Sequence, residues 1–233
     1  MAEGKVSVIL PVHNEGRTLE GNVKRLIGTL DGCLGDYEIL ISEDGSTDGS
    51  TGVAKSLRSA RVRTFHNDNR VGKGAAIKSA AARARGNIII FMDADLASEP
   101  AHVKELVGFI RDGAAIVIGS RYLPGAKASR SMVRYVASRA FNMLVSLLLG
   151  SRLSDHQCGF KAFRKDLVLP VVNEVEDEWW FWDTELLVRA QRRGLRISEI
   201  PIHWKEVSGS RFRLFHDSLK MASCLLKFKL RHG

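Results

Sequence analysis

The chain has 233 residues, of which 45% are hydrophobic and 26% charged, and its formal net charge is +9. This is the composition of an ordinary globular protein, and the positive charge favours nucleotides, nucleic acid or an anionic membrane surface as partners. The cysteines, Cys33, Cys158 and Cys224, form no CxxC pair, which argues against a disulfide framework or a zinc site and favours the cytoplasm. We expect no signal peptide and, because no stretch of 18 uncharged apolar residues exists, no ordinary membrane-spanning helix.

Short apolar runs alternate with helical patterns along the chain. The runs predict buried strands at Val6–Leu10, Tyr37–Ile41, Val62–Phe65, Ile88–Met92, Ala115–Ile118 and Ile197–Ile202. The 3.6-residue spacing between them predicts helices over Leu19–Leu30, capped by Thr18, and over Lys73–Arg85 and Val103–Ile110. This alternation predicts an α/β fold, a mixed and mostly parallel sheet with helices on both faces. We expect a single domain over residues 1–233.

Polar motifs follow the first three predicted strands. The carboxylates of Glu15 and Asp44 are suited to accept hydrogen bonds from a nucleobase or a ribose. A turn with a helix cap is the alternative around Asp44. Further on, Gly72, Lys73 and Gly74 open a predicted helix, where backbone amides and a lysine can bind an anion, although the spacing is not that of a Walker A loop. A simple turn before the helix is the alternative there.

Two acids follow the fourth predicted strand. Asp93 and Asp95 come directly after Ile88–Met92, and alternate residues of an extended chain share a face, so both carboxylates can point the same way. The C-terminal ends of parallel strands are where open α/β sheets bind ligands. Such oxygen ligands suit Mg²⁺ or Mn²⁺, and Mg²⁺ is typically bound by one or two carboxylates together with substrate phosphates. The alternative is a helix-capping aspartate beside an exposed neighbour.

Two segments are amphipathic, at about residues 129–150 and 212–233. In the first, polar residues spaced by four form one slanting stripe on an apolar helix: Arg130, Arg134, Ser138, Asn142 and Ser146. This pattern indicates a helix that lies in a membrane interface or covers a groove. The alternative is a core helix whose polar stripe faces water. The second segment mixes apolar and basic residues and predicts contact with a membrane surface, or else a packed terminal helix with a solvated basic face.

Taken in order, the motifs resemble one family. The strings are PVHNE, EDGSTDGS, NRVGKGAA, DADL, IGSRY, SMVRYVASR, DHQCGFKAF, WFWDTELL and HWKEVSGSR. Each is weak alone, but the ordered set resembles the family 2 glycosyltransferases of GT-A fold, in the branch that uses polyprenyl or dolichyl phosphate. The resemblance implies a nucleotide sugar donor, UDP-glucose or GDP-mannose, and a lipid phosphate acceptor. It also implies Mg²⁺ or Mn²⁺ held by Asp93 and Asp95, and peripheral contact with the cytoplasmic face of a membrane.

The same resemblance implies roles for single residues. Those expected to bind the donor are Pro11, Glu15, Asp44, Lys73, Asp93 and Gln157. Arg121 and Arg134 match arginines that the family places near the acceptor phosphate, and Arg211 is a further candidate. A guanidinium group suits this task because it pairs phosphate oxygens with two donors. Together with Asp93 and Asp95, these arginines and Asp183 form the expected catalytic set.

Three alternatives stay open at this point. In relatives that accept a hydroxyl group, an acid near Asp183 is the catalytic base, so a polysaccharide or glycan acceptor is the second hypothesis. Mannose-type members often carry Gln where this chain has Ala97, which favours glucose as the sugar. A nucleic-acid-binding module is the third, and we expect no nucleic acid partner, because the positive charge is spread along the chain without the aromatic–basic interleaving of known modules.

Overall fold

The computed structural model describes residues 5–207 and 214–232. Its centre is a seven-stranded sheet with the order β3-β2-β1-β4-β7-β5-β8. The strands are β1 (Val6–Val12), β2 (Tyr37–Asp44), β3 (Val62–Asn67), β4 (Ile88–Met92), β5 (Ile116–Ser120), β7 (Phe160–Arg164) and β8 (Ile197–Pro201). Every neighbouring pair is parallel except the two that β7 makes, with β4 and β5. A second small sheet pairs β6 (Lys127–Ser129) with β9 (His203–Lys205).

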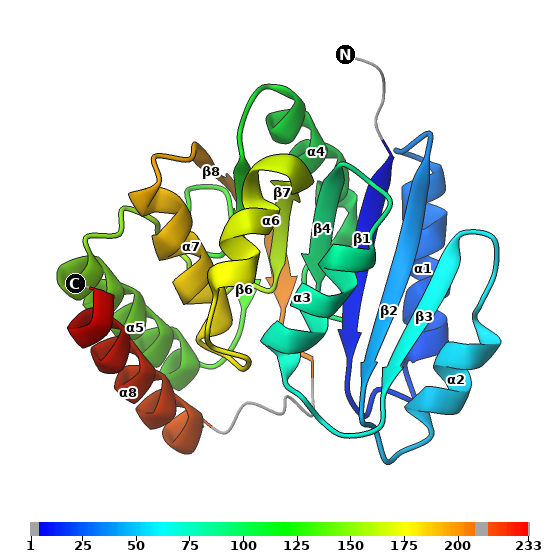
Figure 1. Ribbon diagram of the computed structural model, residues 1–233, viewed down its shortest axis with the longest axis horizontal. Helices are drawn as coiled ribbons and strands as arrows, with labels where there is room; N and C mark the ends of the chain where they lie inside the picture. The colour runs from blue at the N-terminus through cyan, green and yellow to red at the C-terminus, as the bar shows by residue number, and fades with distance from the viewer. Residues whose placement is uncertain (1–4, 208–213, 233) are drawn as a thin grey trace.

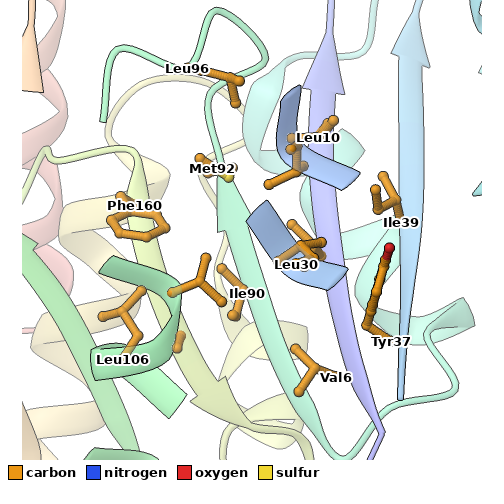
Figure 2. Packing of buried hydrophobic residues seen from close by; sticks show 14 of the residues in the cluster. Val6, Leu10, Leu30, Tyr37, Ile39, Ile90, Met92, Leu96, Leu106 and Phe160 are labelled. Carbon is orange, nitrogen blue, oxygen red and sulfur yellow. The ribbon is translucent and has the colours of Figure 1, made fainter. Parts of the chain in front are cut away.

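Helices cover both faces of the large sheet (Figure 1). One face packs against α1 (Leu19–Asp31), α2 (Ser50–Ser56) and α4 (Val103–Arg111), the last of which follows a short 3₁₀ turn at Pro100–His102. The other face packs against α3 (Lys73–Arg83), α6 (Lys165–Glu174) and α7 (Trp182–Arg192). Figure 2 shows the first of these cores, where Leu30 of α1 and Leu106 of α4 meet Ile90 of β4. Burial of both sheet faces explains why the strands read as continuous apolar runs.

The predicted elements are confirmed, with different ends. The first three strands extend two or three residues further than their predicted apolar runs, because the residues after each run still pair with the neighbouring strand. The helix predicted to end at Arg85 ends at Arg83. Thr18 precedes α1 as expected, but it is not a side-chain cap: its hydroxyl donates to the carbonyl of Glu15. The antiparallel strand β7 was not predicted, since its sequence, Phe160–Arg164, is interrupted by two basic residues.

The helix α5 (Met132–Leu149) corresponds to the first amphipathic segment, and its polar side faces the protein. Asn142 accepts a hydrogen bond from the backbone N–H of His156, at 2.9 Å, and Ser146 donates to the carbonyl of Ser151, at 2.8 Å. The apolar side faces outward, with Met132 and Leu147 73% and 72% exposed. The alternative of a core helix with its polar stripe toward water is therefore wrong.

The terminal helix α8 (Leu214–His232) lies beside α5 at one end of the molecule (Figure 1). Its residues Met221, Leu225 and Phe228 pack in a third apolar cluster with Phe141 of α5. The rest of its surface carries basic residues and exposed leucines, among them Leu230. The sequence allowed two interpretations of this segment, a packed terminal helix and a membrane-facing surface. The same helix can satisfy both, because one side packs on α5 and the other is exposed.

By length and composition alone, α5 is able to cross a membrane, and 17% of it is buried. The expectation of no membrane-spanning helix rested on the lack of an uncharged apolar stretch. Arg134 and Arg139 interrupt the apolar run of α5 while leaving the helix apolar on average. Both arginines lie on or next to the side of α5 that contacts the domain.

Candidate active site

A cavity of about 290 Å³ opens at the C-terminal ends of β1, β2, β4 and β5. This is the edge at which open α/β sheets bind ligands, and the volume approaches that of small-molecule sites. The cavity brings together nine of the ten predicted site residues: Pro11, Glu15, Asp44, Lys73, Asp93, Asp95, Arg121, Arg134 and Gln157. Residues far apart in the sequence thus meet because the C-terminal ends of the parallel strands lie along one edge of the sheet.

Asp44 organises one end of the cavity. Its carboxylate, at the end of β2, accepts hydrogen bonds from the backbone N–H groups of Val71 and Gly72, at 2.7 and 2.9 Å. Gly72 has a φ of +108°, and a Cβ there would lie 2.3 Å from the carbonyl oxygen of Glu178, so only glycine fits. Asp44 therefore fixes the loop before α3, and its remaining lone pairs are available to a ligand in the cavity.

The acid pair lies next to a lysine. Lys73, the first residue of α3, donates from Nζ to Oδ1 of Asp93 at 2.6 Å. Burial disfavours the charged lysine, but the carboxylates of Asp93, Asp183 and Asp95 outweigh it and raise the pKa of Lys73. Burial and the Asp93 carboxylate raise the pKa of Asp95 to about 6. The carboxylates of Asp93 and Asp95 therefore lie close enough to repel each other, as expected of two groups that bind the same cation.

The donor set fits a divalent cation completed by substrate. Asp93 and Asp95 supply carboxylate oxygens, and Mg²⁺ sites commonly use one or two carboxylates plus phosphate oxygens and water. The backbone of Gly159 supports Asp93 so closely that a Cβ there would lie 2.1 Å from Oδ2 of Asp93. Among the described residues no cluster of three or more His, Cys, Asp or Glu forms a cation site, so phosphate would have to complete this one.

Arg121 also lines the cavity. Its guanidinium group pairs with both oxygens of Asp155, from Nε at 2.7 Å and from Nη2 at 2.8 Å, and it lies over the ring of Trp204. Asp155 is fully buried. Although burial disfavours the charge, Asp155 raises the pKa of Arg121. The fork is therefore charged and fixed in orientation, with further N–H donors available to the cavity that Arg121 lines.

Two more arginines line the cavity, at or just before the start of α5. Nε of Arg134 lies 3.1 Å from Oε1 of Glu206. Arg130 precedes the helix and lies against the rings of Tyr122 and Tyr135, with its Cζ 4.8 and 5.2 Å from their centroids. The cavity wall thus combines three arginines with the carboxylates of Asp93 and Asp95.

Asp183 is the predicted site residue that does not line the cavity. It starts α7, is buried, and forms an ion pair with the fully buried Lys161, whose Nζ also donates to the carbonyl of Cys158. A carboxylate held in this way is poorly placed to take a proton from an acceptor hydroxyl. Gln157 does line the cavity, with Nε2 2.9 Å from Sδ of Met221. Arg211 lies outside the described residues.

Sequence reasoning missed Arg130, Asp155 and Gly159 as site residues. Arg130 was visible in the polar stripe of α5, and the other two lie in the DHQCGFKAF string. What the sequence did not show is their contacts: Asp155 pairs with a residue 34 positions earlier, and Gly159 packs against Asp93. Ala97 lines the cavity next to Asp95, as its position after the acid pair suggested.

Comparisons with known proteins all point to glycosyltransferases. A family model described as "Glycosyl transferase family 2" matches residues 7–170. Glycosyltransferase AglD of Haloferax volcanii is 42% identical over 228 residues, which cover 96% of this chain and 36% of that protein. Dolichyl-phosphate beta-glucosyltransferase of Saccharomyces cerevisiae is 31% identical over 97% of this chain and 75% of its own length. The chain thus spans little more than a third of the first relative and three quarters of the second.

Solved structures agree with the sequence comparison. Glucosyl-3-phosphoglycerate synthase from Mycobacterium tuberculosis, in complex with Mn²⁺, UDP-glucose and phosphoglyceric acid, superposes with a TM-score of 0.72 and covers 98% of this chain and 80% of that one. The two sequences are 22% identical, so this likeness concerns the fold.

Proposed function

Because the chain belongs to glycosyltransferase family 2 and has the GT-A fold, we propose that it is an inverting, metal-dependent hexosyltransferase acting on a polyprenyl phosphate such as dolichyl phosphate. The observation that carries the proposal is the set of charged groups that line one cavity. It combines an acid pair suited to a metal–diphosphate complex with arginines suited to a second phosphate.

In the proposed reaction, an oxygen of the lipid phosphate attacks the anomeric carbon of the sugar. The bond from that carbon to the diphosphate breaks, and its electron pair leaves with the nucleoside diphosphate. A phosphate monoester is largely dianionic at neutral pH, since its second pKa is about 6, so no strong base is required. Arg121 and Arg134 position the nucleophile, and Lys73 contributes positive charge near the leaving group.

Asp93 and Asp95 would hold Mg²⁺ or Mn²⁺, which would neutralise charge on the leaving diphosphate. Asp44 and Glu15 would bind the nucleoside, and Gln157 the sugar. We infer glucose, carried by UDP, as the preferred donor, since relatives that match most of the chain are named dolichyl-phosphate beta-glucosyltransferases and Ala97 replaces a glutamine frequent in mannose-type enzymes.

The outward apolar side of α5 supports a lipid acceptor. Met132, Val133, Val136, Met143 and Leu147 are each more than half exposed and lie on one helix whose other side lines the cavity. Such a surface is unusual on a soluble monomer and marks an interaction site. We propose that this side rests in the cytoplasmic interface of a membrane and brings the cavity to the lipid phosphate.

Radiolabelled UDP-glucose and GDP-mannose, each with Mg²⁺ or Mn²⁺ and dolichyl phosphate, test the proposal. We expect an organic-soluble glucosyl lipid from UDP-glucose, lost in Asp93→Asn and retained in Asp68→Asn, whose exposed side chain lies outside the cavity. No lipid product from either donor would refute the function. Equal transfer to dolichol would instead favour a hydroxyl acceptor, in which case Asp183→Asn should abolish turnover.

A further inference from the structure

Arg130 has buried hydrogen-bond donors that nothing in the described part of the chain satisfies. Its Nε and Nη2 atoms are buried and have no hydrogen-bond partner among residues 5–207 and 214–232. Its Nη1 donates weakly to Oγ of Ser138, at 3.4 Å. Buried donors on a charged group are costly to leave unpaired, and native proteins satisfy nearly all of them. Because Arg130 lines the cavity, an anion bound there is the natural partner.

The guanidinium group is held in place before any ligand arrives. It lies against the rings of both Tyr122 and Tyr135, whose centroids are 5.9 Å apart in an edge-to-face arrangement. The Tyr122 hydroxyl is in turn hydrogen-bonded to Ser138 of α5. Contact with two aromatic rings restricts the orientation of a guanidinium group, so its N–H donors need little reorganisation to bind.

The charges around Tyr122 match a dianion. Four arginines surround this ring or line the adjacent cavity wall: Arg121, Arg130, Arg134 and Arg139. Two carboxylates are paired with them, Asp155 with Arg121 and Glu206 with Arg134. The cluster therefore carries two positive charges more than its paired carboxylates balance, and a phosphate monoester above its second pKa carries two negative ones.

We infer that Arg130 binds the phosphate of the acceptor directly, so that the acceptor site consists of Arg121, Arg130 and Arg134 and selects a phosphomonoester. This inference rests on the proposed function for the identity of the acceptor. It adds to that function a cavity-lining residue that has unsatisfied donors, and it accounts for the arginine that lies against the tyrosine rings beside the cavity.

Binding of farnesyl phosphate, a short soluble polyprenyl phosphate, tests the inference by calorimetry without any sugar transfer. Loss of a charge-assisted hydrogen bond predicts that Arg130→Gln weakens this binding roughly 10- to 100-fold. Arg130→Lys should lose part of the affinity, because it keeps the charge but not the fork. Arg139→Gln is the matched control: Arg139 lies 5.0 Å from the same Tyr122 ring but does not line the cavity, so removal of its charge should cost far less affinity than Arg130→Gln does.

Two further probes separate phosphate recognition from lipid contact and from misfolding. Farnesol, which lacks the phosphate, should bind the unmodified protein and Arg130→Gln equally, while inorganic phosphate should displace farnesyl phosphate less well in the variant. If Arg130→Gln unfolds at a lower temperature than the unmodified protein, the farnesyl phosphate affinity of Arg130→Lys decides whether the Arg130 side chain binds phosphate. Unchanged farnesyl phosphate affinity in both variants, or an equal loss for farnesol, would overturn the inference. Failure of sugar transfer alongside Arg130-dependent binding would refute only the proposed function.

Discussion

Gly159 is the residue that sets the position of Asp93. The backbone of β7 begins next to it and passes so close to the carboxylate that a side chain has no room. The structural reason for a glycine here is therefore close approach to the Asp93 carboxylate and not a turn, since its φ is not positive.

Gly159→Ala should displace Asp93 and weaken cation binding. We expect the affinity for Mn²⁺ in the presence of UDP, measured by electron paramagnetic resonance, to fall roughly 10-fold or more, as when other supports of metal ligands are removed. Gly21→Ala on α1, where a Cβ would meet nothing within 4 Å, is the control and should bind normally. Equal affinities in the two variants would mean that Asp93 is not a ligand.

The Arg121–Asp155 pair is buried, and its loss should be costly. Asp155→Asn keeps the shape of the side chain but leaves the Arg121 charge without its carboxylate, at a cost of about 3 kcal/mol in the free energy of unfolding. In the control, Asp166→Asn removes the partner of Arg164 on the surface and should change stability by less than about 1 kcal/mol. Urea unfolding measures both; similar losses would contradict the assignment of a buried, fixed Arg121.

At the scale of the element, α5 shows where sequence reasoning reached its limit. The spacing by four predicted one polar stripe, and the structure confirms it. Which way the stripe faces depends on partners far away in the chain, such as the His156 backbone and Tyr122, which no local pattern reveals. The parallel strands were predictable because burial on both faces makes them apolar throughout, whereas β7, with its two basic residues, was not.

His156 ties α5 to the loop that follows it, and its protonation should loosen this contact. The ring lies between Oδ1 of Asn142, at 2.6 Å, and Oγ of Ser151, at 2.7 Å, and burial lowers the pKa of His156 to about 4. The unfolded chain has a pKa near 6.5, so it takes up the proton first as the pH falls. The stability due to neutral His156 is therefore complete above about pH 6.5 and is lost progressively toward pH 4.

From these pKa values, His156 should account for a loss of about 2 kcal/mol in unfolding free energy between pH 7 and pH 5. The measurement is urea unfolding of the unmodified protein and His156→Gln at both pH values. The variant should be less stable at pH 7 but should lose about 2 kcal/mol less on acidification, since other groups titrate alike in the two proteins. Parallel pH profiles would show that His156 does not supply this pH dependence.

At the scale of the whole molecule, the sheet brings most of the predicted site residues to one cavity. That meeting was predictable, because most of them follow a strand and parallel strands deliver their C-terminal ends to one edge. The exception is Asp183 of α7. Its position in an aromatic string gave no sign that the buried Lys161 of β7 would pair with it. The surface that α5 and α8 share could not be predicted from the sequence either, because it depends on the two helices lying side by side.

That shared surface predicts how the molecule binds a membrane. The apolar side of α5 and the exposed leucines of α8, with basic residues beside them, should bind vesicles that contain anionic lipid. Replacing Val136 and Leu147 together by Glu removes two apolar groups, each contributing about 1.5 to 3 kcal/mol when fully buried, and adds charge repulsion. We expect most of the double variant to stay in the supernatant when vesicles are sedimented, while its binding of UDP stays unchanged. Leu167→Glu on α6, a partly exposed apolar residue outside this surface, should bind vesicles normally; an equal loss there, or no loss in the double variant, would place the membrane contact elsewhere.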